Sequence, residues 1–185
     1  MFIITGFQPF GSNSYNPAEI LARKTAKLLE ESGIKCSSES IAVTPEAADQ
    51  FYDNLNVENK DNLPFVVHIG LDASSSEMCL ETQAKNTLVL PFEEKRSITD
   101  QHSIKSQLHN PFNVKDLQKT LSSQFSLSND AGTYICNYIY YRGIQNTGQK
   151  VKGCIFVHVP LFEVIPEKIQ TENLCNLIRK INEII

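Results

Sequence analysis

Cys136 and His158 are the residues of this sequence best suited to nucleophilic chemistry. Cys136 follows the glycine turn at Gly132 and begins a segment that we interpret as a helix. Free backbone N–H groups and the positive end of a helix dipole stabilise a thiolate, and a nearby imidazolium does so more strongly. His158 ends an apolar strand and is a candidate partner. Each of the two could instead be an ordinary buried residue of the core. Glu81, in the alternating run 79–84, could simply face solvent.

Three candidate groups lie at or just after the ends of buried strands: the loop 6–11, Leu71 and His158. Ligands bind at the carboxyl ends of the strands in open parallel sheets, so these groups could converge. Gly6 and Gly11 have the spacing of a phosphate loop. Ser12 and Asn13, however, stand where that motif needs Lys followed by Ser or Thr, so the phosphate interpretation fails on its key residue.

The same loop carries two aromatic residues, Phe7 and Phe10. An aromatic ring in a loop keeps an unfavourable contact with water unless other groups cover it. The two rings therefore either pack into the core or form the walls of a flat apolar pocket.

The elements that must position these residues follow from capping signals and apolar runs. Asn16 before Pro17 and Thr44 before Pro45 are typical helix starts. We predict strands at 2–5, 40–43, 64–70 and 152–158, a two-stranded excursion within 77–90, a surface loop at 93–111, and helices at 17–32, 45–55, 113–125 and from Pro166 onward.

Strands that alternate with helices predict the α/β class, as an α/β/α sandwich with a mainly parallel twisted sheet. The 185 residues are typical of one domain, and we find no internal repeat or linker, so we expect a single domain over 1–185.

Composition excludes several classes of protein. The net charge is −4 and basic residues do not cluster, so the charge pattern of a nucleic-acid binder is missing. No run approaches the roughly 18 apolar residues of a membrane span. The five cysteines are odd in number and at no metal-ligand or disulfide spacing, and the start has no basic leader. We therefore expect reduced thiols in a cytoplasmic protein and a small-molecule or peptide partner.

Several motifs stand in order along most of the chain: Thr5–Gly11 with Asn16-Pro17, Val67–Gly70, Leu80-Glu81 with Asn86, Gly132–Asn137 with Tyr140-Tyr141, and Phe156–Pro160. Together they resemble the motifs of the pyroglutamyl peptidases of type I, the pyrrolidone-carboxylate cysteine peptidases.

The resemblance implies a hydrolase that removes N-terminal 5-oxoproline from peptides through a thioacyl intermediate, without metal or cofactor. Cys136 would be the nucleophile, His158 the acid/base and Glu81 the group that orients the imidazole. By the same analogy, the substrate ring would lie between Phe7 and Phe10. Its lactam would pair with backbone groups near Leu71 and in the turn that contains Tyr134 and Ile135.

This sequence departs from the family pattern in places. Ser12 replaces a glycine common in bacterial members, Leu71 stands where many have Gln, and the segment 88–110 lacks their acidic and arginine pattern. These departures concern substrate contacts and assembly, and the oligomeric state stays open between monomer and tetramer.

Three alternatives remain at this stage. A catalytically silent homologue would bind pyroglutamyl groups without turnover. A phosphorylase-like transferase would share the fold, but it needs basic phosphate ligands in the first loop, which this sequence lacks. Within the peptidase interpretation, His68 is the rival of His158, because it also ends a buried strand.

Overall fold

The computed structural model describes residues 1–11, 14–56, 59–121 and 124–185; Ser12 and Asn13 lie outside the described residues. The strands are β1 (Phe2–Phe7), β2 (Cys36–Ile41), β3 (Phe65–Leu71), β4 (Cys79–Glu81), β5 (Gln83–Lys85), β6 (Gln107–His109), β7 (Ser126–Ser128) and β8 (Gly153–Val159). The helices are α1 (Pro17–Glu31), α2 (Pro45–Asn54), the 3-10 turn η1 (Lys60–Asn62), α3 (Val114–Thr120), α4 (Ile135–Asn146) and α5 (Glu167–Ile184).

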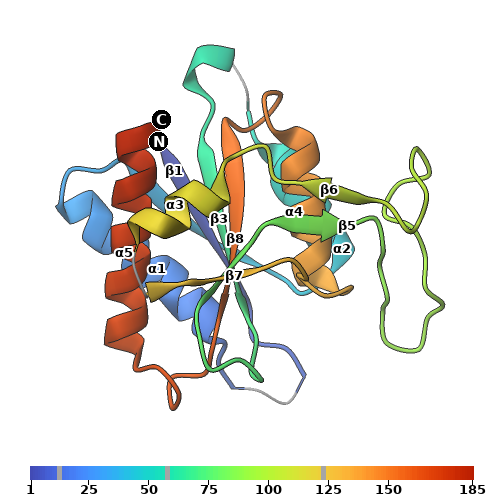
Figure 1. Cartoon of the computed structure of the whole chain (residues 1–185), viewed down its shortest axis with the longest axis horizontal. Coiled ribbons are helices and arrows are strands. Elements are labelled where there is room, and N and C mark those ends of the chain that lie inside the picture. Colours follow the sequence, from blue (N-terminus) through green and yellow to red (C-terminus); the bar gives the residue numbers. More distant parts are fainter. Residues whose placement is uncertain (12–13, 57–58, 122–123) are drawn as a thin grey trace.

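Six strands form the central sheet in the order β2-β1-β3-β8-β4-β7 (Figure 1). All neighbouring pairs in it are parallel except β4 with β8, which is antiparallel. Helices α1, α3 and α5 cover one face, and α2 and α4 cover the other. The predicted α/β sandwich with a mainly parallel sheet is therefore confirmed.

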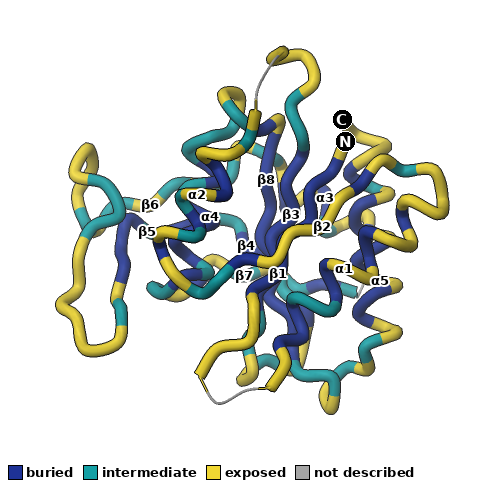
Figure 2. The backbone as a smooth tube through the Cα atoms, turned by 180° about the vertical axis from the view of Figure 1, so that it is seen from behind, coloured by how far each residue is buried: buried dark blue, intermediate teal, exposed yellow. Residues whose placement is uncertain are grey.

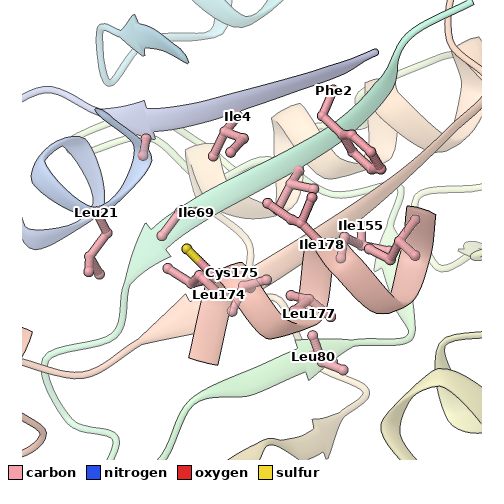
Figure 3. Packing of buried hydrophobic residues seen from close by; sticks show 14 of the residues in the cluster. Phe2, Ile4, Leu21, Ile69, Leu80, Ile155, Leu174, Cys175, Leu177 and Ile178 are labelled. Atoms are coloured by element: carbon pink, nitrogen blue, oxygen red, sulfur yellow. The ribbon is translucent and has the colours of Figure 1, made fainter. Parts of the chain in front are cut away.

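Each face of the sheet has its own core, because successive side chains of a strand point to opposite faces. Val67 and Ile69 of β3 and Ile155 of β8 join the cluster under α1 and α5 (Figure 3). Val66 and Phe156 join the cluster under α2 and α4. The central strands are buried along nearly their whole length (Figure 2). This alternation places residues 68, 70 and 158 on the α4 side of the sheet.

Helices α1 and α2 begin at the capping residues that the sequence predicts. The Asn16 side chain accepts a hydrogen bond from the Ala18 N–H at 3.0 Å, and Pro17 takes the first helical position. Thr44 accepts from the Ala47 N–H at 3.2 Å, ahead of Pro45. In both cases the side-chain oxygen satisfies an N–H that has no partner within the helix.

The structure differs from several sequence predictions. The strand expected at 40–43 is β2, shifted toward the N-terminus; only its end residues, Cys36 and Ile41, are buried, so no apolar pattern marks it. The helix expected at 113–125 ends at Thr120, and β7 follows it. Residues 122 and 123 of that segment lie outside the described part of the chain.

The segment after β4 also pairs differently than predicted. β4 belongs to the main sheet, whereas β5 pairs with β6 in a separate two-stranded sheet, so the excursion expected within 77–90 is wrong in its pairing. β6 lies within the loop predicted at 93–111. Part of that loop is held by the buried Asn86 side chain, which accepts from the N–H groups of Ile98 and Thr99 at 3.0 and 2.9 Å. No helix in the described ranges is long and apolar enough to span a membrane.

Candidate active site

His158 and Glu81 form a buried pair on neighbouring strands. His158 of β8 lies opposite Cys79 of β4, and Glu81 follows two residues later on the same face of that strand. The His158 Nδ1–H donates to Glu81 Oε1 at 2.7 Å, and the two residues are only 9 % and 1 % exposed. The carboxylate therefore fixes the orientation of the imidazole and favours its charged form.

Cys136 lies in the first turn of α4, above the end of β3. Gly70 of β3 is directly opposite His158 in the register, and a Cβ built on Gly70 would be 3.0 Å from the Cys136 Sγ. The thiol is also close enough to the imidazole of His158 to raise the pKa of that group. Three side chains far apart in the sequence thus form one connected group, from thiol to imidazole to carboxylate.

The electrostatics of His158 reflect these two partners. Burial lowers the pKa of His158, but the hydrogen bonds to Cys136 and Glu81 outweigh it and raise the pKa to about 10. The imidazole is therefore cationic at neutral pH, as a counter-ion for a thiolate must be.

Helix α4 presents backbone N–H groups beside the thiol. Tyr134 is the residue before its first turn and provides no side-chain cap. The N–H groups of Ile135 and Cys136 have no acceptor within the helix, because the first four N–H groups of any α-helix lack one. They are therefore the candidate donors to an oxygen on a carbon attached to Sγ.

Sequence reasoning missed the side chains that hold this group in place. Asn137 is fully buried; its Oδ1 accepts from the Lys85 N–H at 2.8 Å, and its Nδ2 donates to the Lys85 and Thr87 carbonyls, both at 2.9 Å. The Tyr140 hydroxyl donates to the Glu81 carbonyl at 2.7 Å. The Asn that directly follows the candidate nucleophile is the sequence signal that could have suggested this role.

The rival histidine, His68, lies apart from this group. It is fully buried, with Nδ1 2.7 Å from Thr5 Oγ1 and Nε2 2.5 Å from the Tyr52 hydroxyl. Burial lowers the pKa of His68 to about 3, so it stays neutral. Both of its nitrogens are engaged, and neither is bonded to the thiol.

A pocket of about 340 Å³ lies beside His158 on the side of β4 and β7. Its lining residues are Leu71, Asp72, Ala73, Cys79, Glu81, Ser128, Asp130, Ala131, Gly132 and His158. A larger hollow of about 890 Å³, lined by residues 82–83, 109–115 and 127–129, contains none of Cys136, His158 and Glu81. The smaller pocket is the one that His158 and Glu81 line. In the described part of the chain, no group of three or more His, Cys, Asp or Glu residues is arranged to hold a metal ion.

The residues expected to bind substrate differ in how far they are buried. Phe7 ends β1 and is buried in the cluster under α2 and α4, as its core alternative predicted. Phe10 is exposed, and Leu71 is half-buried at the rim of the small pocket. Tyr134 is half-buried, and Ile135 is fully buried at the start of α4. Their roles toward substrate stay predictions.

A thiol at a helix N-terminus, close to an imidazole that a buried carboxylate orients, is the arrangement of a cysteine hydrolase. The comparisons with known proteins agree with that class. A family model described as pyroglutamyl peptidase matches residues 1–177. The pyrrolidone-carboxylate peptidase of Pyrococcus furiosus is 27 % identical over 180 residues, covering 90 % of this chain and 82 % of that protein.

Solved structures give the same result. The pyrrolidone carboxyl peptidase from Thermus thermophilus superposes with a TM-score of 0.78 at 25 % identity, covering 97 % of this chain and 100 % of that one. The enzyme from Fervidobacterium islandicum has the same TM-score at 23 % identity, with 98 % of each chain covered, which shows the shared fold.

The chain belongs to the pyroglutamyl peptidase family. It is therefore a hydrolase of the cysteine exopeptidase type, and the family removes N-terminal pyroglutamate from peptides. Neither the silent-binding nor the phosphorylase-like alternative finds support in these matches.

Proposed function

We propose that Cys136, His158 and Glu81 hydrolyse the amide bond that follows an N-terminal pyroglutamyl residue. The observation that carries this assignment is the position of the His158 imidazole, which is bonded to Glu81 Oε1 at 2.7 Å and lies opposite Gly70, above which the Cys136 thiol is placed. A peptidase needs a nucleophile and a proton donor for the leaving amine, and this group contains both.

In the acylation step, the Cys136 thiolate attacks the carbonyl carbon attached to the lactam ring. The oxygen becomes an oxyanion that accepts hydrogen bonds from the N–H groups at the start of α4. As the C–N bond breaks, the His158 imidazolium donates a proton to the leaving amine. The products of this step are the shortened peptide and a pyroglutamyl thioester on Cys136.

In the deacylation step, water attacks the thioester carbonyl. Neutral His158 accepts a proton from the water, and the C–S bond breaks to release pyroglutamic acid. The thiolate and the imidazolium are thereby restored, with Glu81 holding the imidazole in the same orientation throughout. Every proton transfer uses side chains of this chain.

Selection of the pyroglutamyl ring follows from its chemistry, because the ring is flat, uncharged and carries one amide N–H and one carbonyl. We propose that Phe10 covers the ring, that Phe7 supports this wall from the core, and that backbone groups near Leu71 and at Tyr134 and Ile135 pair with the lactam. A free N-terminal glutamate would lose hydration of its charges without equivalent partners, so it is rejected.

A fluorogenic amide tests the function. We expect the protein to release the fluorophore from a pyroglutamyl amide and not from the matching prolyl amide, which has a similar ring but a charged amine. Glu81→Gln should lower kcat while the thiol stays reactive, because nucleophile and base remain in place. Binding of the pyroglutamyl amide without any thiol-dependent release would instead identify a silent homologue.

We also propose that residues 1–185 act as one domain in the cytoplasm, on peptide substrates and without nucleic-acid or membrane partners. The net charge of −4 and the free state of all five cysteines support this setting. Sedimentation of the purified protein will give its oligomeric state.

A further inference from the structure

The order of strands places the candidate groups in a line across the sheet. Phe7 ends β1, the Cys136 thiol lies above Gly70 of β3, His158 is on β8, and residues of β4 and β7 line the 340 Å³ pocket. If the pyroglutamyl ring lies on the β1 side of the thiol, the leaving amine points toward His158. The next residue of the peptide then extends past His158 into the pocket.

The walls of this pocket are acidic. None of the described residues that line it is Lys or Arg, whereas Asp72 and Asp130 both line it. Asp130 is neutralised by the Lys85 ammonium at 2.6 Å. Asp72 forms no ion pair with any described residue, although the positive charge of His158, which also lines the pocket, acts on it. Its carboxylate can therefore still pair with a cationic group of a ligand.

Asp72 is held in place at the pocket. Its backbone N–H donates to the Val159 carbonyl at 2.9 Å, and its Oδ1 accepts from the Ser74 N–H and hydroxyl at 3.0 and 2.7 Å. Partial burial raises the pKa of Asp72, but the hydrogen bonds from Ser74 and the positive charge of His158 lower it overall. The carboxylate is therefore charged at neutral pH and fixed in direction.

A second carboxylate lies at the same pocket. Glu81 is 1 % exposed, its Oε1 is bonded to His158, and its Oε2 has no hydrogen-bond partner among the described residues. Glu81 lines the pocket next to the proposed leaving group, so it contributes negative charge there besides Asp72.

We propose that this pocket binds the residue that follows pyroglutamate, and that Asp72 makes it favour a cationic side chain such as lysine or arginine. The proposal rests on the proposed function, because the direction of the peptide is set by the thiol and His158. An ion pair of this partly exposed kind changes kcat/KM by about 1.4- to 5-fold at low salt, and the repulsion of a glutamate side chain adds a similar factor to the lysine-to-glutamate ratio.

The test compares three pyroglutamyl peptides that differ only in the second residue: lysine, norleucine, which keeps the stem without the charge, and glutamate. We expect kcat/KM to decrease in that order and the differences to shrink in 1 M salt. In Asp72→Asn the lysine-to-glutamate ratio should fall by about three- to tenfold. Because both substrates are measured on the same protein, any effect of Asp72 on His158 cancels in the ratio.

Asp61→Asn is the matched control, since Asp61 is an exposed carboxylate in η1, just before the start of β3. It should leave the ratio unchanged. An unchanged ratio in Asp72→Asn, or equal use of the lysine and glutamate peptides by the parent protein, would overturn the proposal.

Binding to the Cys136→Ala protein separates the two hypotheses. Calorimetry with the uncleaved peptides gives the lysine-to-glutamate affinity ratio without any turnover. If the parent protein cleaves none of the peptides, the proposed function fails, and the affinity ratio and its loss in Asp72→Asn still decide the pocket. Equal affinities would overturn the pocket proposal even in an active enzyme.

Discussion

Gly70→Ala should disable the thiol while leaving the fold in place. The added Cβ would lie 3.0 Å from the Cys136 Sγ and 2.6 Å from the Phe156 Cζ. Neither contact is sustainable, so both the thiol and the phenyl ring must move. Because the thiol lies near His158, its movement also changes the thiol–imidazole geometry.

The size of the effect follows from these distances. At 3.0 Å the sulfur must move by a few tenths of an ångström, and a misplacement of about 1 Å in an active site costs on the order of a hundredfold in rate. We therefore expect kcat to fall by about ten- to a hundredfold. KM should change little, because the added methyl group faces the thiol. Overpacking of this kind destabilises a fold by about 1–3 kcal/mol.

Gly153→Ala is the matched control. Gly153 starts β8, opposite Phe65 of β3, and its added Cβ would lie 2.7 Å from the Phe65 Cε2. It crowds a phenyl ring between the same two strands without touching the thiol. Steady-state kinetics on the pyroglutamyl amide and urea unfolding should show similar stability losses for both variants but a kcat loss in Gly70→Ala alone.

A kcat of Gly70→Ala equal to that of Gly153→Ala, in folded protein, would refute this reasoning. If Gly70→Ala does not fold, Gly70→Ala combined with Phe156→Leu relieves the ring contact and keeps the contact with Cys136. The same kcat loss is then expected.

The remaining predictions concern individual side chains. Cys136→Ala should abolish hydrolysis with little change in stability, whereas Cys154→Ala, in the core, should keep turnover; a comparable loss in folded Cys154→Ala would exclude Cys136 as sole nucleophile. His158→Ala should remove rapid alkylation of Cys136 by iodoacetamide near neutral pH, and His68→Asn should not; the reverse result would exchange their roles. Because the pKa of folded His68 is about 3 against 6.5 when exposed, only the unfolded chain binds its proton between these values. Its contribution to stability is complete above pH 6.5 and falls by up to about 1.4 kcal/mol per unit below it, so urea unfolding of His68→Asn should show a weaker acid dependence. Phe10→Ala should lower kcat/KM by about ten- to a hundredfold with a small effect on the unfolding midpoint; loss of the fold would favour a core role.

Local signals in the sequence predicted the elements that carry the site. Apolar runs marked β3 and β8, and the Asn-Pro and Thr-Pro pairs marked the starts of α1 and α2. These signals work because they act within a few residues of the chain. β7 lacks such a signal: it is a three-residue Ser-Leu-Ser strand, and only its pairing with β4 defines it.

The choice between His158 and His68 needed the tertiary structure. Both histidines lie in apolar strands, so their sequence settings are alike. Only the fold shows that Tyr52 and Thr5 occupy both nitrogens of His68, while Glu81 of a neighbouring strand meets His158. The sequence did not predict that Gly70 leaves room for the Cys136 thiol, because a glycine in a strand does not indicate which side chain packs against it.

The central position of β8 has a consequence for how the molecule assembles. β8 lies between β3 and β4 in the sheet, although it is the last strand in the sequence. A chain still in synthesis that ends before Gly153 can pair β1, β2 and β3, but β4 and β7 have nothing to join them to that half. Such distant pairings form slowly and leave strand edges open meanwhile. Formation of the sheet, and with it of the carboxylate–imidazole pair, must therefore wait until β8 has left the ribosome.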